Sequence, residues 1–178
     1  MNQNTKNQTI LIIGLIVLAA FARLIPHSMG IVMGFSPIIA LSIFGGANLK
    51  NRKLAYLIPI GVMLLTDIFI GMHSTMWAVY GAIALGVLIG GLISKNITAP
   101  KVVGASLSSS VIFFVITNFA VWMQFNMYPH TFEGLQACYV AAIPFFRTAL
   151  LGDLIWSVVL FGSYALAKNH ITAFADAK

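Results

Sequence analysis

Only 8% of the 178 residues are charged and 60% are hydrophobic, with a formal net charge of +6. A soluble domain carries roughly 25% charged residues, so this chain has too few charges to cover a water-facing surface. We therefore predict an all-α integral membrane protein, with residues 1–178 forming a single membrane domain. The basic residues lie in short loops between apolar runs, which is typical of membrane topology and not of nucleic-acid binding.

Six apolar runs are long enough to cross a hydrocarbon core of about 30 Å. In chain order they are Thr9–Ile25, Ile31–Ala47, Leu54–Gly71, Met76–Ser94, Val102–Met123 and Phe145–Ala167. The second run is short, contains Pro37 and ends in Gly45-Gly46, so we expect a kinked or partly unwound helix there. A signal peptide is the rival interpretation of the first run, because Lys6 and Ala20-Phe21-Ala22 resemble a charged start and a cleavage site.

The lysines and arginines predict the topology. One side of the predicted membrane collects eight of the ten: Lys6, Lys50, Arg52, Lys53, Lys95, Lys101, Lys168 and Lys178. The other side has only Arg23 and Arg147. The positive-inside rule therefore places both termini in the cytoplasm, and we expect a multi-pass protein of the bacterial inner membrane.

Small residues at four-residue spacing mark two of the runs. Ala82, Gly86 and Gly90 lie in the fourth, and Gly104 and Ser108 lie in the fifth. Such spacing lets helix backbones approach closely. We interpret it as packing inside one bundle, with a partner-docking face as the alternative.

Ionisable groups in the spans are the first candidates for a site. Arg23, Asp67, Arg147 and Asp153 all fall in the predicted outer half of the membrane. Charges at this depth cost at least a few kcal/mol, so they normally pair or line a wet cavity. Arg147 and Asp153 point about 120° apart on one helix, so each needs a partner from another helix. Structural ion pairs and an outward-facing polar cavity are the two interpretations.

The predicted outer loops add further candidates. His27, His73 and His130 fall in three separate outer loops, where they could meet a metal or ligand or be ordinary surface histidines. Pro129, Thr131 and Glu133 indicate a helix start within Gln124–Pro144, which predicts a short lid helix over the outer mouth.

Asn118 and Trp122 lie one turn apart near that lid. Together they could contact polar and apolar parts of a ligand, although tryptophan also anchors helices at the membrane interface. Motifs of metalloproteases, serine hydrolases and nucleotide-binding loops are missing, so we do not expect an enzyme or a resident cofactor.

Several strings resemble a family of small bacterial membrane proteins. They are Arg23-Leu24-Ile25-Pro26-His27, Phe35-Ser36-Pro37-Ile38-Ile39-Ala40, Phe44-Gly45-Gly46-Ala47, Leu64-Leu65-Thr66-Asp67, Gly71-Met72-His73-Ser74-Thr75-Met76, Thr117-Asn118-Phe119, Val121-Trp122 and Cys138 to Asp153. This family is similar to the substrate-binding S components of energy-coupling-factor (ECF) transporters. The resemblance implies six transmembrane helices and a ligand pocket under the outer loops.

The solitary cobalamin-binding S components are the most similar type. The resemblance implies a vitamin-like ligand such as cobalamin, with His73 as the cobalt ligand, and an energy-coupling module (a transmembrane subunit plus ATPases) as partner. The candidates found above fall in this same outer region, so we expect the pocket to be bordered by Arg23, His27, Asp67, His73, Asn118, Trp122, Arg147 and Asp153.

This sequence departs from the S-component pattern in two places. Gly34 and Ser36 stand where that family has asparagine and threonine, and the first span lacks alanines spaced for docking to a partner. Asn2 argues against the nickel and cobalt branch. Two other classes stay open: a membrane-embedded enzyme acting on a lipid or isoprenoid substrate, and a small structural or channel-like protein.

Overall fold

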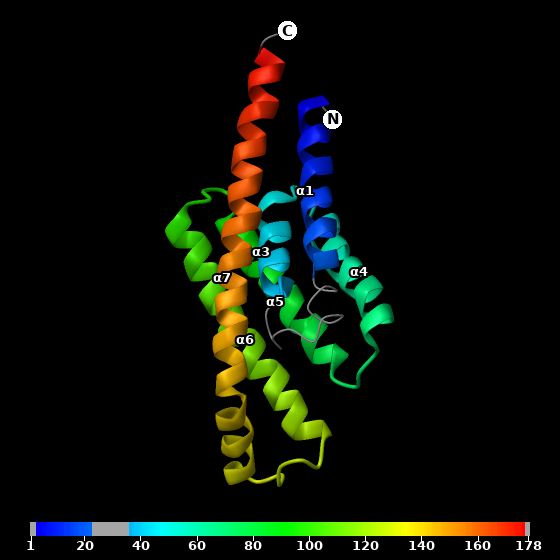
Figure 1. Ribbon diagram of the computed structural model, residues 1–178, viewed down its shortest axis with the longest axis vertical. Coiled ribbons are helices and arrows are strands. Elements are labelled where there is room, and N and C mark those ends of the chain that lie inside the picture. Colours follow the sequence, from blue (N-terminus) through cyan, green and yellow to red (C-terminus); the bar gives the residue numbers. More distant parts are fainter. Residues whose placement is uncertain (1–2, 23–35, 177–178) are drawn as a thin grey trace.

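The computed structural model describes residues 3–22 and 36–176, and side chains over 6–21 and 36–168. Within this part the chain forms helices and no strand. The helices are α1 (Gln3–Ala22), α3 (Ile38–Asn48), α4 (Arg52–Ile70), α5 (Met76–Ile93), α6 (Ala99–Gln124) and α7 (Phe132–Asp176). Successive helices run in opposite directions, so the start of α1 and the end of α7 lie at the same end of the bundle (Figure 1). We call this the termini end.

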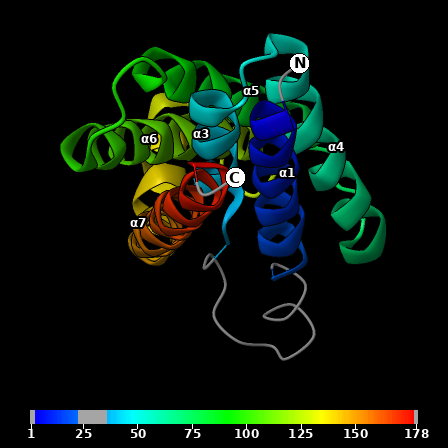
Figure 2. The same cartoon turned by 90° about the horizontal axis from the view of Figure 1, so that it is seen from above.

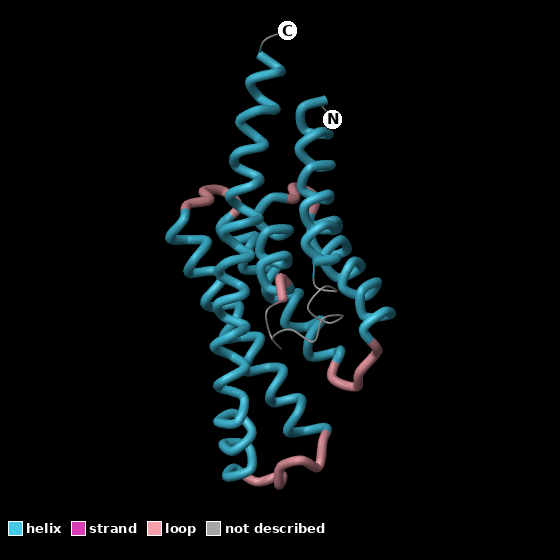
Figure 3. The backbone as a smooth tube through the Cα atoms, in the orientation of Figure 1, coloured by secondary structure: helices cyan, strands magenta, loops and turns pink. Residues whose placement is uncertain are grey.

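The loops divide between the two ends of the bundle. Residues 49–51 and 94–98 connect helices at the termini end, and residues 71–75 and 125–131 connect them at the opposite end (Figure 3). The basic cluster at Lys50 and the loop with Lys95 therefore share an end with the chain termini, as the topology prediction requires. Which end faces the cytoplasm stays a prediction.

Four helices are long and apolar enough to cross a membrane. They are α4, α5, α6 and the Phe132–Lys168 part of α7. The apolar stretch Lys6–Phe21 of α1 and the whole of α3 are shorter. The protein is thus a membrane protein with four such helices among the described residues, and six complete crossings stay a prediction.

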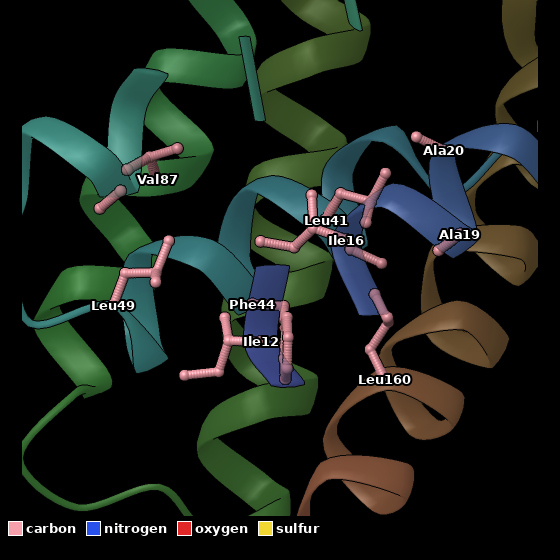
Figure 4. Packing of buried hydrophobic residues seen from close by; sticks show 11 residues of the cluster. Ile12, Ile16, Ala19, Ala20, Leu41, Phe44, Leu49, Val87 and Leu160 are labelled. Atoms are coloured by element: carbon pink, nitrogen blue, oxygen red, sulfur yellow. The ribbon is translucent and has the colours of Figure 1, made fainter. Parts of the chain in front are cut away.

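The short helix α3 is the centre of the bundle. It contacts α1, α4, α5, α6 and α7, and Figure 2 shows it surrounded by these helices. Every residue from Ile39 to Ala47 is buried. Phe44 packs edge-on against Phe161 and Tyr164 of α7, with ring centroids 5.2 and 5.7 Å away. Figure 4 shows Phe44 in a cluster with side chains of α1, α5 and α7.

Glycines allow α3 and α5 to pack closely. A methyl group added at Gly90 would overlap the backbone of Ile43, and one added at Gly86 would overlap the Ser42 side chain. Gly104 of α6, in contrast, has no neighbour within 4 Å of an added methyl group. The spacing at Ala82, Gly86 and Gly90 is therefore internal packing, as predicted.

The predicted lid helix is wrong. Its start is correct, because the Thr131 hydroxyl accepts a hydrogen bond from the Gly134 amide at 3.2 Å, next to the first residue of α7. However, the helix continues through Pro144 to Asp176 as one 45-residue helix. Proline removes one backbone hydrogen bond, yet a helix packed against neighbours can continue through it.

The first part of α7 also lies along α6 and does not cover a mouth. The Tyr139 hydroxyl donates to the Val115 carbonyl at 2.8 Å, and the Phe114 ring packs against Tyr139 and Phe146. At about 1.5 Å per residue, α7 is about twice as long as a hydrocarbon core is thick. It therefore extends beyond the bilayer.

Candidate functional site

The site begins where α3 begins, inside the bundle. Pro37 is buried and precedes the helix, and its carbonyl accepts a hydrogen bond from the Leu41 amide at 2.8 Å. With 11 residues, α3 is about 17 Å long, or about half the thickness of a hydrocarbon core. Its partly positive N-terminus therefore lies at membrane depth and not at the membrane surface.

Asp153 of α7 faces this helix start. It is only 4% exposed, and the backbone amide of Ile39 lies near its carboxyl group. The Ser110 hydroxyl of α6 donates to Asp153 Oδ2 at 2.6 Å. A carboxylate is favoured at a helix N-terminus by the helix dipole, so Asp153 joins α3, α6 and α7 at one point.

Further buried hydroxyl groups lie on α6, on α7 and just before α3. Ser106 and Ser157 approach each other at 3.3 Å across the same α6–α7 interface. The hydroxyl oxygens of Ser36 and Ser109 are buried and have no hydrogen-bond partner in the described part of the chain. An unpaired buried hydroxyl costs about 1–3 kcal/mol, and in native proteins a ligand or ordered water often satisfies it. Ser36 directly precedes Pro37, so one of these groups lies at the start of α3.

Asp67 forms a second buried contact, between α4 and α5. It is 1% exposed, and the Tyr80 hydroxyl donates to its Oδ2 at 2.7 Å. Just beyond it, α4 ends at Gly71, whose φ of 114° is a conformation that favours glycine. The Gly71 amide donates to the Asp67 backbone carbonyl at 2.8 Å. Asp67 is thus fixed at the last turn of α4.

Trp122 and Asn118 lie on α6, near the loop at the opposite end. The Trp122 indole Nε1 donates to the Pro129 carbonyl at 2.9 Å, and its ring meets the His130 ring edge-on at 5.4 Å. The Asn118 amide nitrogen donates to the Phe114 carbonyl at 2.8 Å. The Trp122 contacts hold the loop before α7 against the end of α6, whereas the Asn118 bond lies within α6.

The remaining predicted site residues lie in a loop, on α7 and outside the described part of the chain. His73 is exposed in the loop between α4 and α5, with its Nδ1 3.2 Å from the Thr75 hydroxyl. Arg147 is exposed on α7, and no described residue pairs with it. Arg23 and His27 lie outside the described residues. Within the described ranges, three or more His, Cys, Asp or Glu side chains do not cluster as a metal site would require.

The predicted site residues make their contacts at several places in the bundle. Asp67 contacts Tyr80 of α5, Asp153 contacts Ser110 of α6, and Trp122 contacts the loop before α7. The common outer cavity stays a prediction. An arginine partner was expected for Asp153; among the described residues its contacts are instead Ser110 and the Ile39 amide.

Sequence reasoning missed Ser110 and Tyr80, the partners of the two carboxyl groups. Ser108-Ser109-Ser110 is a run of three hydroxyl residues inside an apolar span, which is itself a signal. Polar side chains within spans usually face other helices. Tyr80 gave no comparable signal, because its ring is as apolar as its neighbours.

A family model described as a family of unknown function (DUF6580) matches residues 3–174. The chain belongs to this family. No curated protein and no solved structure matches it. Membership in the DUF6580 family assigns no activity, so the function has to be argued from the geometry.

Proposed function

We propose that this DUF6580 protein is the substrate-binding membrane subunit of an uptake system for a vitamin-like micronutrient. The observation that carries the proposal is the start of α3 at membrane depth, next to buried Asp153. In membrane transporters, substrates and coupling ions bind near the membrane midplane at interrupted helices. Irregular backbone at this depth is tolerated only where protein buries it or where it lines a cavity.

The arrangement of the carboxyl groups favours binding over catalysis. Asp67 and Asp153 each accept a hydrogen bond from a hydroxyl group on a neighbouring helix. These bonds tie each carboxyl group to a neighbouring helix, which suits a group that shapes a binding site more than one that exchanges protons with a substrate. A lipid or isoprenoid enzyme is therefore the weaker alternative.

The resemblance to ECF S components suggests cobalamin or a related corrinoid as the ligand. His73 supports this choice because it is exposed, and Thr75 contacts its Nδ1. A hydrogen bond at one ring nitrogen orients the other toward a metal, so Nε2 would be the nitrogen that binds cobalt. The sequence has no nucleotide-binding motif, so an ATP-hydrolysing module would supply the energy for uptake.

The test is a titration of purified full-length protein with cobinamide, a corrinoid without its own lower base. Binding through a histidine should shift the visible absorption spectrum of the corrinoid. His73→Ala should abolish this shift, and His130→Ala, which changes another histidine of the opposite end, should keep it. Absence of the shift in the unchanged protein would refute a corrinoid ligand. Conversion of added lipid to a new product would favour the enzyme alternative.

A further inference from the structure

The termini end of the bundle contains a cavity of about 700 Å³. Its lining comes from α1, the end of α3, the loop that leads from α3 into α4, the first residue of α4, the loop after α5 and the C-terminal part of α7. Its polar lining comes from Gln8, Thr9, Asn48, Ser94, Tyr164 and the basic residues described below. This is the end of the molecule away from the loops predicted to hold the substrate.

The cavity is strongly basic. Lys50, Arg52 and Lys168 line it, and none of the described lining residues is acidic. Two helices, α3 and α5, end at the cavity, and α4 begins there at Arg52. A helix C-terminus carries roughly half a negative charge and an N-terminus roughly half a positive charge, so these partial charges largely cancel and the basic side chains set the sign of the cavity.

The start of α4 determines where Lys50 and Arg52 lie in the cavity wall. The Asn51 side chain accepts hydrogen bonds from the amides of Lys53 at 3.0 Å and Leu54 at 3.4 Å, which begins α4 directly after Lys50. The Arg52 guanidinium extends from the first residue of α4 onto Gly91 of α5. Because Gly91 has no side chain, the guanidinium can approach α5 closely at the edge of the cavity.

The cavity also has an apolar part at the level of the membrane surface. Ile12, Leu49, Ile97 and Phe161 line it. The apolar helices α4 and α5 begin and end at this level, at Arg52 and Ile93. A phospholipid headgroup lies at the same level and presents both a phosphate and the first carbons of its chains.

We propose that this cavity binds a phosphate group, and specifically that of an anionic phospholipid. Arginine and lysine are the side chains that recognise phosphate, by paired hydrogen bonds and by charge. The proposal is independent of the uptake function, because it concerns the opposite end of the bundle.

The test is isothermal titration calorimetry on the full-length protein in a non-ionic detergent. The ligands are dioctanoylphosphatidylglycerol, dioctanoylphosphatidylcholine and inorganic phosphate. One variant replaces the three basic cavity residues (Lys50→Gln, Arg52→Gln and Lys168→Gln). The matched control removes the same charge from residues that do not line the cavity (Lys53→Gln, Lys95→Gln and Lys101→Gln).

Phosphatidylglycerol should bind saturably to the unchanged protein, and phosphatidylcholine more weakly. The cavity variant should lose at least about tenfold in affinity, since each basic group near an anionic headgroup contributes measurably, while the control should change by less than about twofold. Equal losses in both variants, or no saturable binding of any phosphate compound, would overturn the proposal. Saturable binding of inorganic phosphate with the same variant pattern would support a phosphate site but assign it to a soluble anion.

A second variant covers the case in which the triple variant does not fold. Ala165→Trp adds bulk to a small lining residue on α7 and leaves the charge unchanged. It should weaken phosphatidylglycerol binding by at least about tenfold if the ligand enters the cavity. Unchanged binding by a folded Ala165→Trp protein would show that the lipid binds elsewhere.

Discussion

The Ser110 hydroxyl donates a 2.6 Å hydrogen bond to Asp153 and thereby joins α6 to α7 inside the bundle. The same hydroxyl lies 2.9 Å from the Ser106 carbonyl of its own helix. A serine has one proton to donate, and the shorter contact is the one to the carboxyl group. A carboxylate is also the stronger acceptor, so the bond between helices should take precedence over the bond within α6.

The first prediction concerns this bond. Ser110→Ala should lower the free energy of unfolding by about 1–3 kcal/mol, because it removes a donor from a buried carboxyl group. Unfolding in mixed detergent micelles, followed by circular dichroism, would measure the change. The control is Ser108→Ala on the same helix, whose exposed hydroxyl donates to the Gly104 carbonyl at 2.8 Å.

The control should change stability by less than about 0.5 kcal/mol, as surface substitutions usually do. If both alanine variants lose the same stability, the contact between Ser110 and Asp153 does not hold α6 and α7 together.

The second prediction concerns Asp67. Tyr80→Phe removes the hydroxyl that donates to Asp67 at 2.7 Å while keeping the ring. We expect a loss of about 1–3 kcal/mol in the same unfolding measurement. Tyr56→Phe is the matched control, since the Tyr56 hydroxyl makes no hydrogen bond within the described ranges and its ring is half-buried. A Tyr80→Phe protein as stable as its control would contradict a structural role for the Asp67 contact.

Periodicity and composition were sufficient to predict most helices. The predicted runs Leu54–Gly71 and Met76–Ser94 differ from α4 and α5 by at most two residues at each end. Lipid requires long, continuous apolar segments with polar ends, so span length is a direct constraint on sequence. The short α3 was harder, because its start depends on Pro37 and on contacts from other helices.

Side-chain partners could not be predicted in the same way. The sequence identified Asp153 as costly at membrane depth, and the simplest remedy was an arginine of opposite charge. The structure uses Ser110 and the Ile39 amide instead, since hydroxyl and backbone donors can also stabilise a buried carboxyl group. Likewise, Pro144 suggested a break, but the packing of Tyr139 against α6 keeps the helix continuous.

The third prediction tests the close packing of α3 and α5. Gly90→Ala should destabilise the protein by about 1–3 kcal/mol or more, because the new methyl group overlaps the backbone of Ile43. Gly104→Ala places the same methyl group in open space on α6. This control should be neutral or slightly stabilising, since alanine favours helix over glycine. Equal destabilisation by both substitutions would mean that α3 and α5 do not pack through Gly90.

The last prediction concerns orientation in the membrane. Asn96 and Asn126 are exposed and lie in loops at the two ends of the bundle, so single cysteines at these positions report which end faces outward. The background is Cys138→Ser, because Cys138 is the only cysteine. Its buried thiol lies 3.6 Å from the Asn118 carbonyl, and a serine hydroxyl can donate to the same oxygen.

Only the Asn126→Cys protein should react with a membrane-impermeant thiol reagent in intact cells, because the basic loops are expected in the cytoplasm. Asn96→Cys should react only after the membrane is permeabilised, which controls for its accessibility. Asn51 is unsuitable for this purpose, since its side chain caps α4, and a change there would cost about 1 kcal/mol. Labelling of Asn96→Cys in intact cells would invert the topology. It would then place the basic cavity outside the cell, and His73 and Trp122 inside it.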